Sequence, residues 1–317
     1  MGYTQPVNVH SHPSILSCAS RPGTQATRIR DKKMVSIIIP AYNEEAVIGR
    51  TLSFLLEGAD RTALDIIVCC NGCVDRTAEI ARSFGPPVRV VETSKGSKTL
   101  ALNMGDEAAR SFPRIYLDAD ILLSYDSVKQ IVRELDDNKE LAVAPRMRVD
   151  LTGRSWLIRA FYDVWLKTPY HQKGMIGSGI YALSEEGRKR FQEFPEIIAD
   201  DGFVHALFGP DERKALDGCE FTITPPVTFS GLLRIKTRAR LGIKELWQKY
   251  PELMRKHVSA EKADTERSGY KKLLLQPLLW PQLAVYTFVK LVAAVRAKSQ
   301  LAKLKQYQWE RDESSRV

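Results

Sequence analysis

Between residues 34 and 120, short apolar runs alternate with stretches that place apolar residues on one helical face. Each apolar run has the length of a buried strand, and each amphipathic stretch has the length of a helix. Strands that alternate with helices at this spacing predict a parallel α/β sheet with crossover helices. The expected strands are 35–39, 65–69, 88–91, 115–117 and 141–144, and the expected helices are 47–55, 75–84, 97–111 and 128–135.

Two carboxylates, Asp118 and Asp120, come directly after the strand expected at 115–117. Ligands of open α/β sheets bind beyond the carboxyl ends of the strands. Hard oxygen ligands select Mg²⁺ or Mn²⁺, which commonly hold phosphates through one or two carboxylates. A lone Asp-x-Asp is also typical of a solvated loop, so its meaning depends on the motifs around it.

Three further motifs accompany this pair. They lie at 39–45, 71–77 and 95–105, and each follows an expected strand. The first strand is followed neither by the dinucleotide fingerprint G-x-G-x-x-G nor by the phosphate loop G-x-x-x-x-G-K-[ST]. Together with Asp118-Ala-Asp120, the three motifs resemble those of the family 2 glycosyltransferases, in the family's order and with its spacing. The resemblance covers about residues 34–245.

The resemblance implies a GT-A fold, which is Rossmann-like and has a mixed, mainly parallel sheet flanked by helices. It also implies an enzyme that takes a sugar from a nucleotide-sugar donor, with Mn²⁺ or Mg²⁺ as cofactor. The sugar would pass to a hydroxyl acceptor with inversion, and the acceptor would be a glycan or a lipid-linked molecule.

Residues of the first motif are implied to line the nucleobase and ribose pocket: Pro40, Ala41, Tyr42 and Glu44. Asn71 stands where many family members carry an acid that binds uracil. Its amide can still pair with a base, which favours a UDP-sugar donor and leaves a GDP-sugar open. Lys98 is implied to meet the diphosphate or the ribose. The same residues also suit an ordinary strand-to-helix turn and a solvated lysine.

The resemblance assigns Asp120 as the direct metal ligand and Asp118 to the ribose or to a metal-bound water. A later pair, Asp200 and Asp201, matches the family's acids ahead of a helix, with Asp201 at the position of the catalytic base. Asp200 would be the base if the register differs by one residue, and both could instead only cap the helix. The glycine-containing stretch 176–180 resembles the segment that walls the sugar site.

A basic run at 234–242 stands where the family often carries a Q-x-x-R-W segment on a gating loop, but neither Gln nor Trp occurs there. Arg238 or Arg240 could meet the diphosphate or face a membrane. The missing segment argues against a processive synthase and favours addition of a single sugar.

Positive charge is concentrated in the C-terminal part of the chain. Residues 232–317 hold 19 Lys and Arg against 8 Asp and Glu, whereas the whole chain has a net charge of +9. The apolar run 273–295 is long enough to span a membrane, but prolines, glutamines and Lys290 interrupt it. Trp280 and Tyr286 with basic flanks favour an interfacial helix over a span or a helix packed on the domain. We therefore expect a cytoplasmic enzyme bound peripherally to the anionic inner face of the cell membrane, without nucleic acid as a partner.

The expected domains are a disordered tail at 1–33, a GT-A domain at 34–245 and a basic helical segment at 246–317. The tail lacks the periodicity of a helix or a strand. The chain has five cysteines, three of them close together, and this pattern does not predict a disulfide framework. Cys70 and Cys73 form a C-x-x-C, which leaves a zinc or redox site open. The rival functions are a sugar nucleotidyltransferase and a non-catalytic protein that binds anionic lipid or nucleic acid through its basic C-terminus.

Overall fold

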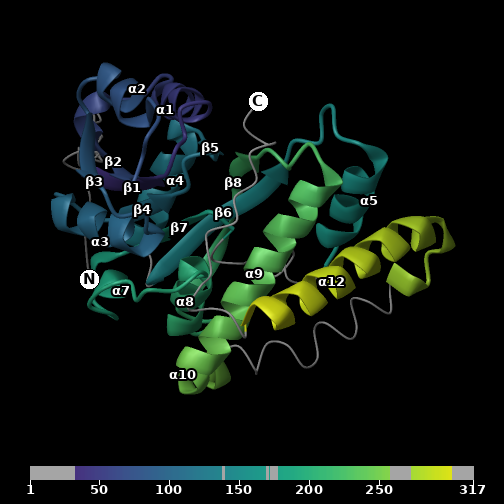
Figure 1. Cartoon of the computed structure of the whole chain (residues 1–317). Helices are drawn as coiled ribbons and strands as arrows, with labels where there is room; N and C mark the ends of the chain where they lie inside the picture. The colour runs from purple at the N-terminus through teal and green to yellow at the C-terminus, as the bar shows by residue number, and fades with distance from the viewer. Residues whose placement is uncertain (1–32, 138–139, 169–170, 172–177, 258–272, 302–317) are drawn as a thin grey trace, which may run out of the picture. The chain divides into compact units, whose positions relative to one another are not determined.

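Within the described part of the chain, an eight-stranded mixed sheet forms the centre of the unit that begins at residue 34 (Figure 1). The computed structural model describes residues 33–137, 140–168, 171, 178–257 and 273–301. The tail predicted at 1–33 therefore lies outside the described residues, except for its last residue. In sheet order the strands are β3 (Val88–Thr93), β2 (Leu64–Asn71), β1 (Val35–Ala41), β4 (Arg114–Leu117), β7 (Ile180–Leu183), β6 (Ala142–Val149), β8 (Arg213–Ile223) and β5 (Leu122–Leu123).

Strands β3, β2, β1 and β4 are parallel neighbours, so their carboxyl ends lie along one edge of the sheet. Ala41 at the end of β1 pairs with Cys70 near the end of β2. Both β1 and β2 are buried along their whole length, as expected where helices cover both faces of a parallel sheet. This half of the sheet confirms the α/β arrangement that the sequence predicts.

Antiparallel pairing begins at β7, which lies between β4 and β6 and runs opposite to both. Strand β5 also pairs antiparallel with β8, whereas β6 and β8 are parallel. The sheet is therefore mixed, as expected for the predicted fold class. Strand direction changes beside β4, and the candidate site lies at this point.

Helices cover both faces of the sheet. Their bounds are α1 (Ile48–Leu56), α2 (Thr77–Ser83), α3 (Lys98–Ala108), α4 (Tyr125–Asp137), α5 (Trp156–Trp165), α7 (Glu185–Arg188), α8 (Asp200–Leu207), α9 (Phe229–Lys249), α10 (Pro251–His257) and α12 (Trp280–Leu301), with the 3₁₀ turns η1 (Arg61–Ala63) and η2 (Pro277–Leu279). Because successive strand residues point to opposite faces, Ile37 and Ile39 pack in a core with α1, α2 and α4, and Ile38 packs in a second core with α3, α8 and α10. Figure 1 shows α1 and α2 on one side of the sheet and α3 on the other.

A third core joins α5, α9 and α12. The ring of Phe161 on α5 stacks on that of Tyr286 on α12, with 5.3 Å between the ring centroids. Leu232 on α9 and Val289 on α12 are fully buried in the same core. The domain boundary predicted at residue 245 falls inside α9, so this helix runs across the boundary between the two predicted segments.

Asp106 on α3 forms a buried ionic centre with residues from two other elements. Its carboxylate accepts from Arg114 Nη1 of β4 at 2.5 Å and from Arg188 Nε of α7 at 2.7 Å. The hydroxyl of Tyr116 on β4 donates to the same carboxylate at 2.7 Å. The three charged side chains are at most 14% exposed. This centre therefore fixes α3 and α7 against β4, next to the candidate site.

Candidate active site

The loops after β1 and β2 are tied together by side-chain hydrogen bonds. Asn43 Oδ1 accepts from the Val74 N–H at 2.8 Å, and Asp75 accepts from the Glu45 N–H at 3.0 Å. Asp75 also accepts from the N–H of Thr77 at the start of α2, at 3.0 Å. The first two sequence motifs therefore form one connected unit beyond the strand ends. Asp75 joins the two loops and also accepts from the first N–H of α2, which begins at Thr77 with Arg76 at its N-cap rather than at Asp75.

Asn71 ends β2 and is 4% exposed. Its side-chain amide donates to the backbone oxygens of Ala41 at 2.8 Å and Cys69 at 3.4 Å. The amide N–H donors are thus directed to the protein, and the polar atom that remains for a ligand is the Oδ1 acceptor.

The other residues predicted for the nucleobase and ribose pocket lie at the end of β1 and in the loop that follows it. Tyr42 is 39% exposed, and its ring packs on the backbone of Gly96, where an added Cβ would lie 3.4 Å from Tyr42 Cε2. Glu44 is buried, and its carbonyl oxygen accepts from the first N–H of α1 at 2.9 Å. Ala41 belongs to the core of the sheet, while Pro40 lines the pocket that also holds the acids.

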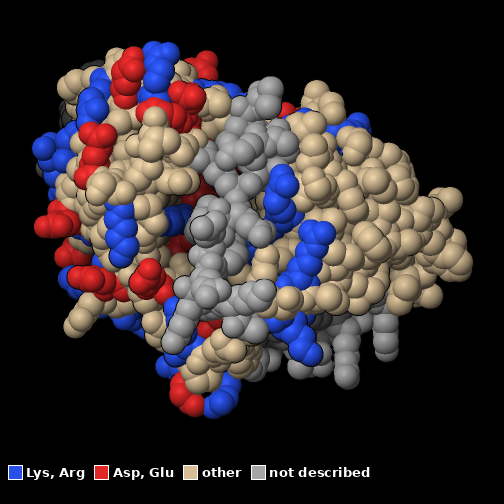
Figure 2. All heavy atoms as spheres, in the orientation of Figure 1, with Lys and Arg blue, Asp and Glu red and all other residues tan. Residues whose placement is uncertain are grey.

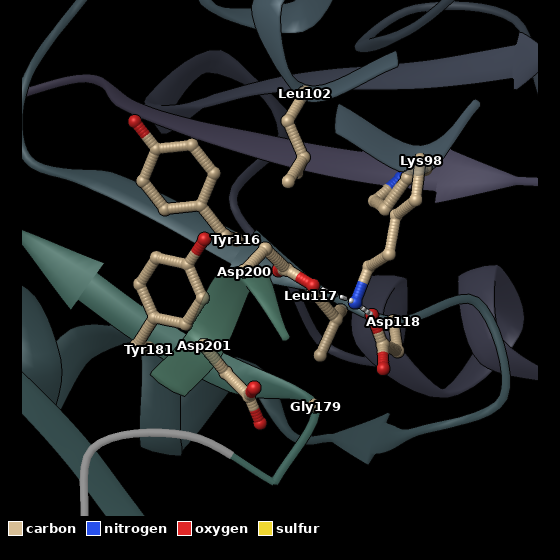
Figure 3. Close-up of a pocket in the computed structure, with 10 residues that line it drawn as sticks. Lys98, Leu102, Tyr116, Leu117, Asp118, Gly179, Tyr181, Asp200 and Asp201 are labelled. Carbon is tan, nitrogen blue, oxygen red and sulfur yellow. Dashed lines mark ion pairs between the residues drawn. The ribbon is translucent and has the colours of Figure 1, made fainter. Parts of the chain in front are cut away.

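Lys98, the first residue of α3, lies between two carboxylates. Its Nζ is 2.8 Å from Asp118 Oδ1 and 3.0 Å from Asp200 Oδ1 (Figure 3). Ser97 caps this end of α3 by accepting from the Leu100 N–H. Burial alone would lower the pKa of Lys98, but Asp118 and Asp200 outweigh that effect and raise the pKa above its usual value. Lys98 is therefore a charged group inside the acidic site rather than a solvated lysine.

The acids around Lys98 bring more negative charge to the site than one lysine can neutralise. Burial raises the pKa of Asp118 against the effect of Lys98, and the charges of Asp120 and Asp201 add to the rise. Burial also raises the pKa of Asp200 to about 6, again against the effect of Lys98. Such a cluster favours the binding of a further cation.

Backbone N–H groups hold both carboxylate oxygens of Asp201. Oδ2 accepts from the N–H of Ser178 at 3.1 Å, and Oδ1 accepts from the next residue at 2.7 Å. The segment before β7 can reach Asp201 because Gly179 has φ +97°. A Cβ at this position would lie 2.3 Å from Ile121 and 3.1 Å from Asp118 Oδ2, so glycine is required there. The described end of the predicted sugar-site segment thus lies between Asp118 and Asp201.

These groups line one small pocket at the change of strand direction (Figure 3). Its wall consists of Pro40, Lys98, Leu102, Tyr116, Leu117, Asp118, Gly179, Tyr181, Asp200 and Asp201. Predicted site residues from four separate parts of the sequence thus converge. The sequence gives no sign of Tyr116 and Tyr181 as site residues, because each is one ring within a short apolar strand.

Arg238 and Arg240 lie within α9, and neither belongs to the pocket wall. The basic run at 234–242 is therefore helical rather than a gating loop. The physical reason is a stripe of residues at helical spacing, including Thr237 and Leu241, that α9 buries.

The acids after β4 fit a divalent cation that is shared with a phosphate. Among the described residues, no three His, Cys, Asp or Glu side chains form a ready-made metal cage. Mg²⁺ is usually bound through one or two carboxylates plus substrate phosphates rather than by such a cage. The excess negative charge at Asp118 and Asp120 suits this kind of binding. Cys70 and Cys73 are free thiols, and neither belongs to a metal-binding group within the described ranges.

Comparison with known proteins agrees with these observations. Residues 36–185 match the model of glycosyl transferase family 2. The chain is also 28% identical over 170 residues to 4,4'-diaponeurosporenoate glycosyltransferase of Staphylococcus aureus. That alignment covers 52% of this chain and 43% of the relative, so the chain spans less than half the length of the curated relatives it matches.

Solved structures with a similar fold are GT-A glycosyltransferases. A mannosyltransferase, PcManGT from Pyrobaculum calidifontis in complex with GDP-Man and Mn²⁺, has a TM-score of 0.62 and 20% identity, over 86% of this chain and 87% of that chain. S. aureus TarS 1–349 in complex with UDP-GlcNAc has a TM-score of 0.50 and 14% identity, over 88% and 93%. Glucosyl-3-phosphoglycerate synthase from Mycobacterium tuberculosis, with Mn²⁺ and UDP, has a TM-score of 0.50 and 20% identity, over 68% and 79%. At these identities the likeness shows the fold, and the expected GT-A fold is confirmed.

Proposed function

We propose that this chain, a member of glycosyl transferase family 2 through residues 36–185, transfers one sugar from a nucleotide-sugar donor to a hydroxyl acceptor. The observation that carries the proposal is the position of Lys98 between Asp118 and Asp200. These residues lie at the sheet edge that also carries the loops after β1 and β2. A diphosphate that enters here meets a lysine and acids that suit a divalent cation. Asp201 on the same pocket wall supplies a carboxylate for the acceptor.

We infer that the donor is a UDP-sugar in preference to a GDP-sugar. Asn71 keeps an Oδ1 acceptor, which matches the single imino N–H of uracil. Guanine presents two adjacent donors and suits a carboxylate, the charged group that this position lacks. The exposed ring of Tyr42 offers a surface on which a base can stack, and Pro40, Ala41 and Glu44 complete the proposed pocket for the base and ribose.

In the proposed reaction the acceptor oxygen attacks the anomeric carbon while the bond to the diphosphate oxygen breaks on the opposite face. Asp201 takes the hydroxyl proton as the base, and this single displacement inverts the anomeric centre. Lys98 lies beside the leaving diphosphate and offsets its negative charge. Asp120 and Asp118 would hold Mn²⁺ or Mg²⁺, which when bound stabilises charge on the leaving group.

Thermal shift with a donor panel, in the presence of Mn²⁺, tests this proposal. We expect UDP and UDP-sugars to stabilise the protein, because a ligand that binds the folded state adds about 2.7 kcal/mol at 100 times its Kd. GDP and GDP-sugars should give a smaller shift. Transfer or slow hydrolysis should then follow with one UDP-sugar.

Two results would contradict this assignment. Formation of a nucleotide sugar from UTP and a sugar 1-phosphate would establish the nucleotidyltransferase alternative instead. Binding of anionic lipid or nucleic acid without a response to any nucleotide sugar would favour the non-catalytic alternative.

We also propose that the enzyme lies on the anionic inner face of the cell membrane and uses a lipid-linked acceptor. The segment 277–301 is, among the described residues, the one helix long and apolar enough to cross a membrane by length and composition. One side of α12 is buried on α5 and α9, so the helix lies along the protein. Apolar side chains are exposed on its other side, on η2 and the residues just before it, and at the start of α5: Trp156, Leu157, Leu274, Leu275, Leu278, Trp280, Phe288, Leu291 and Val295.

Charge supports this surface as a place for anionic lipid. Figure 2 shows a broad face without charged side chains over α5 and α12, with Lys and Arg at its border. Lys290, Arg296 and Lys298 are exposed on α12. Insertion of apolar side chains flanked by cations is the pattern of an interfacial helix.

Replacement of Leu278 by Glu tests the membrane proposal. Leu278 is 91% exposed, and its burial in lipid would contribute about 1.5–3 kcal/mol. L278E should therefore lower binding to vesicles that contain phosphatidylglycerol by roughly tenfold or more, as measured by flotation. V74E is the matched control, since Val74 is 90% exposed on the loop before α2 and should have no effect. Equal binding of wild type, L278E and V74E would contradict this surface.

A further inference from the structure

Two stacked tyrosines on the pocket wall differ in their hydrogen bonds. Tyr116 of β4 and Tyr181 of β7 are paired across the two strands, and their ring centroids are 4.8 Å apart. Both are 2% exposed. The Tyr116 hydroxyl donates to Asp106. The Tyr181 hydroxyl is buried and, within the part of the chain that the structure describes, has no hydrogen-bond partner.

A buried hydroxyl without a partner lowers the stability of a folded chain, because it has lost its hydrogen bonds to water. The native sequence nevertheless keeps the hydroxyl at this position, where phenylalanine would fit. Tyr181 lines the same pocket as Lys98, Asp200 and Asp201, and Figure 3 shows its ring beside that of Tyr116. An unused donor in the wall of a candidate ligand site indicates a bond that forms only when the ligand is present.

We propose that the Tyr181 hydroxyl binds the transferred sugar, by donating a hydrogen bond to one of its oxygen atoms. This inference rests on the proposed function. The wall combines chemistry that suits a hexose: Leu102, Leu117 and the Tyr116 ring are apolar, and the carboxylate of Asp200 can accept hydrogen bonds from sugar hydroxyls. Tyr181 supplies a hydrogen-bond donor from β7, whereas the hydroxyl of Tyr116 on β4 is already bonded to Asp106.

In the proposed binding mode Lys98 and Tyr181 contact different parts of the donor. The lysine bridges Asp118 and Asp200 on the pocket wall. A diphosphate offers Lys98 a further negatively charged partner, whereas the Tyr181 hydroxyl is left for the sugar. The nucleoside diphosphate therefore binds without Tyr181, whereas the sugar of the intact donor requires it.

The variant Y181F separates these two contributions. We expect its Kd for UDP-glucose or GDP-mannose, whichever the wild type binds, to rise about five- to tenfold, the effect of one hydrogen bond. Its Kd for the matching nucleoside diphosphate should change by less than twofold. Isothermal titration calorimetry with Mn²⁺ measures both.

The melting temperature of the unliganded protein provides an independent readout. Y181F should melt higher than wild type by about 2 °C, because an unsatisfied buried group is removed. Y116F is the matched control and should melt lower, since it breaks the hydrogen bond to Asp106. A lower melting temperature for Y181F, or equal losses of affinity for nucleotide sugar and nucleoside diphosphate, would overturn the inference. If wild type binds no nucleotide sugar of the donor panel, the proposed function itself fails, and that result does not depend on the variant.

Discussion

Replacement of Asp201 by Asn is expected to lower kcat roughly 10²- to 10⁴-fold, the usual contribution of a general base, while the Kd for the donor stays within a few-fold of wild type. Asp201 is proposed to act on the acceptor proton and not on the donor. Its two oxygens are held by the N–H groups of Ser178 and Gly202, so the carboxylate is already oriented toward the pocket. Asparagine keeps the shape of the side chain but cannot take a proton.

The neighbouring Asp200 provides the control for this prediction, because the two acids have different surroundings. Asp200 is 3% exposed and is paired with Lys98. D200N should therefore free Lys98 from one partner and change donor affinity as well as kcat. Steady-state transfer rates with the donor from the panel, together with calorimetric Kd values, distinguish the two. A D201N enzyme with wild-type kcat, beside a D200N enzyme that has lost it, would assign the base to Asp200.

The parallel half of the fold could be predicted from the sequence because its signals are local. Each strand from β1 to β4 is an apolar run followed by a turn, and each crossover helix has its own amphipathic face. In the other half of the sheet only the start of β6 was predicted, as the strand expected at 141–144. Strand β7 has only four residues, and the pairing of β8 with β6 shifts register between Pro145 and Arg146. Such pairings depend on contacts between distant segments.

Four charged residues of the candidate site could be predicted because each belongs to a motif that occurs in the order of the family. Asp118, Asp200, Asp201 and Lys98 all reach one pocket, although no local pattern states that Lys98 pairs with two of the acids. Asn71 shows the limit of such reasoning. An asparagine can pair with a nucleobase, but the side-chain N–H groups of Asn71 donate to the backbone oxygens of Ala41 and Cys69. These contacts arise from strand pairing and cannot be read from spacing.

Replacement of Asp106 by Asn is expected to lower the free energy of unfolding by about 3–5 kcal/mol, the cost of breaking a buried ion pair from one side. The substitution removes the only negative charge in the described surroundings that is paired with both Arg114 and Arg188. Their side chains are 14% and 13% exposed, so water cannot replace the lost partner. The hydroxyl of Tyr116 also loses a charged acceptor. Urea unfolding followed by tryptophan fluorescence measures the change.

The exposed pair of Glu252 and Arg255 provides the matched control. Its distance, 2.5 Å, equals that between Asp106 and Arg114, but its side chains are 86% and 62% exposed. E252Q should therefore change stability very little, because exposed ion pairs contribute between about 0 and 1 kcal/mol. A loss below about 1 kcal/mol in D106N would mean that the two arginines find other partners or water. Asp106 joins α3, which carries Lys98, to β4, which ends at Leu117 directly before Asp118. The large loss would therefore show that this buried charge stabilises the part of the fold that carries the acidic site.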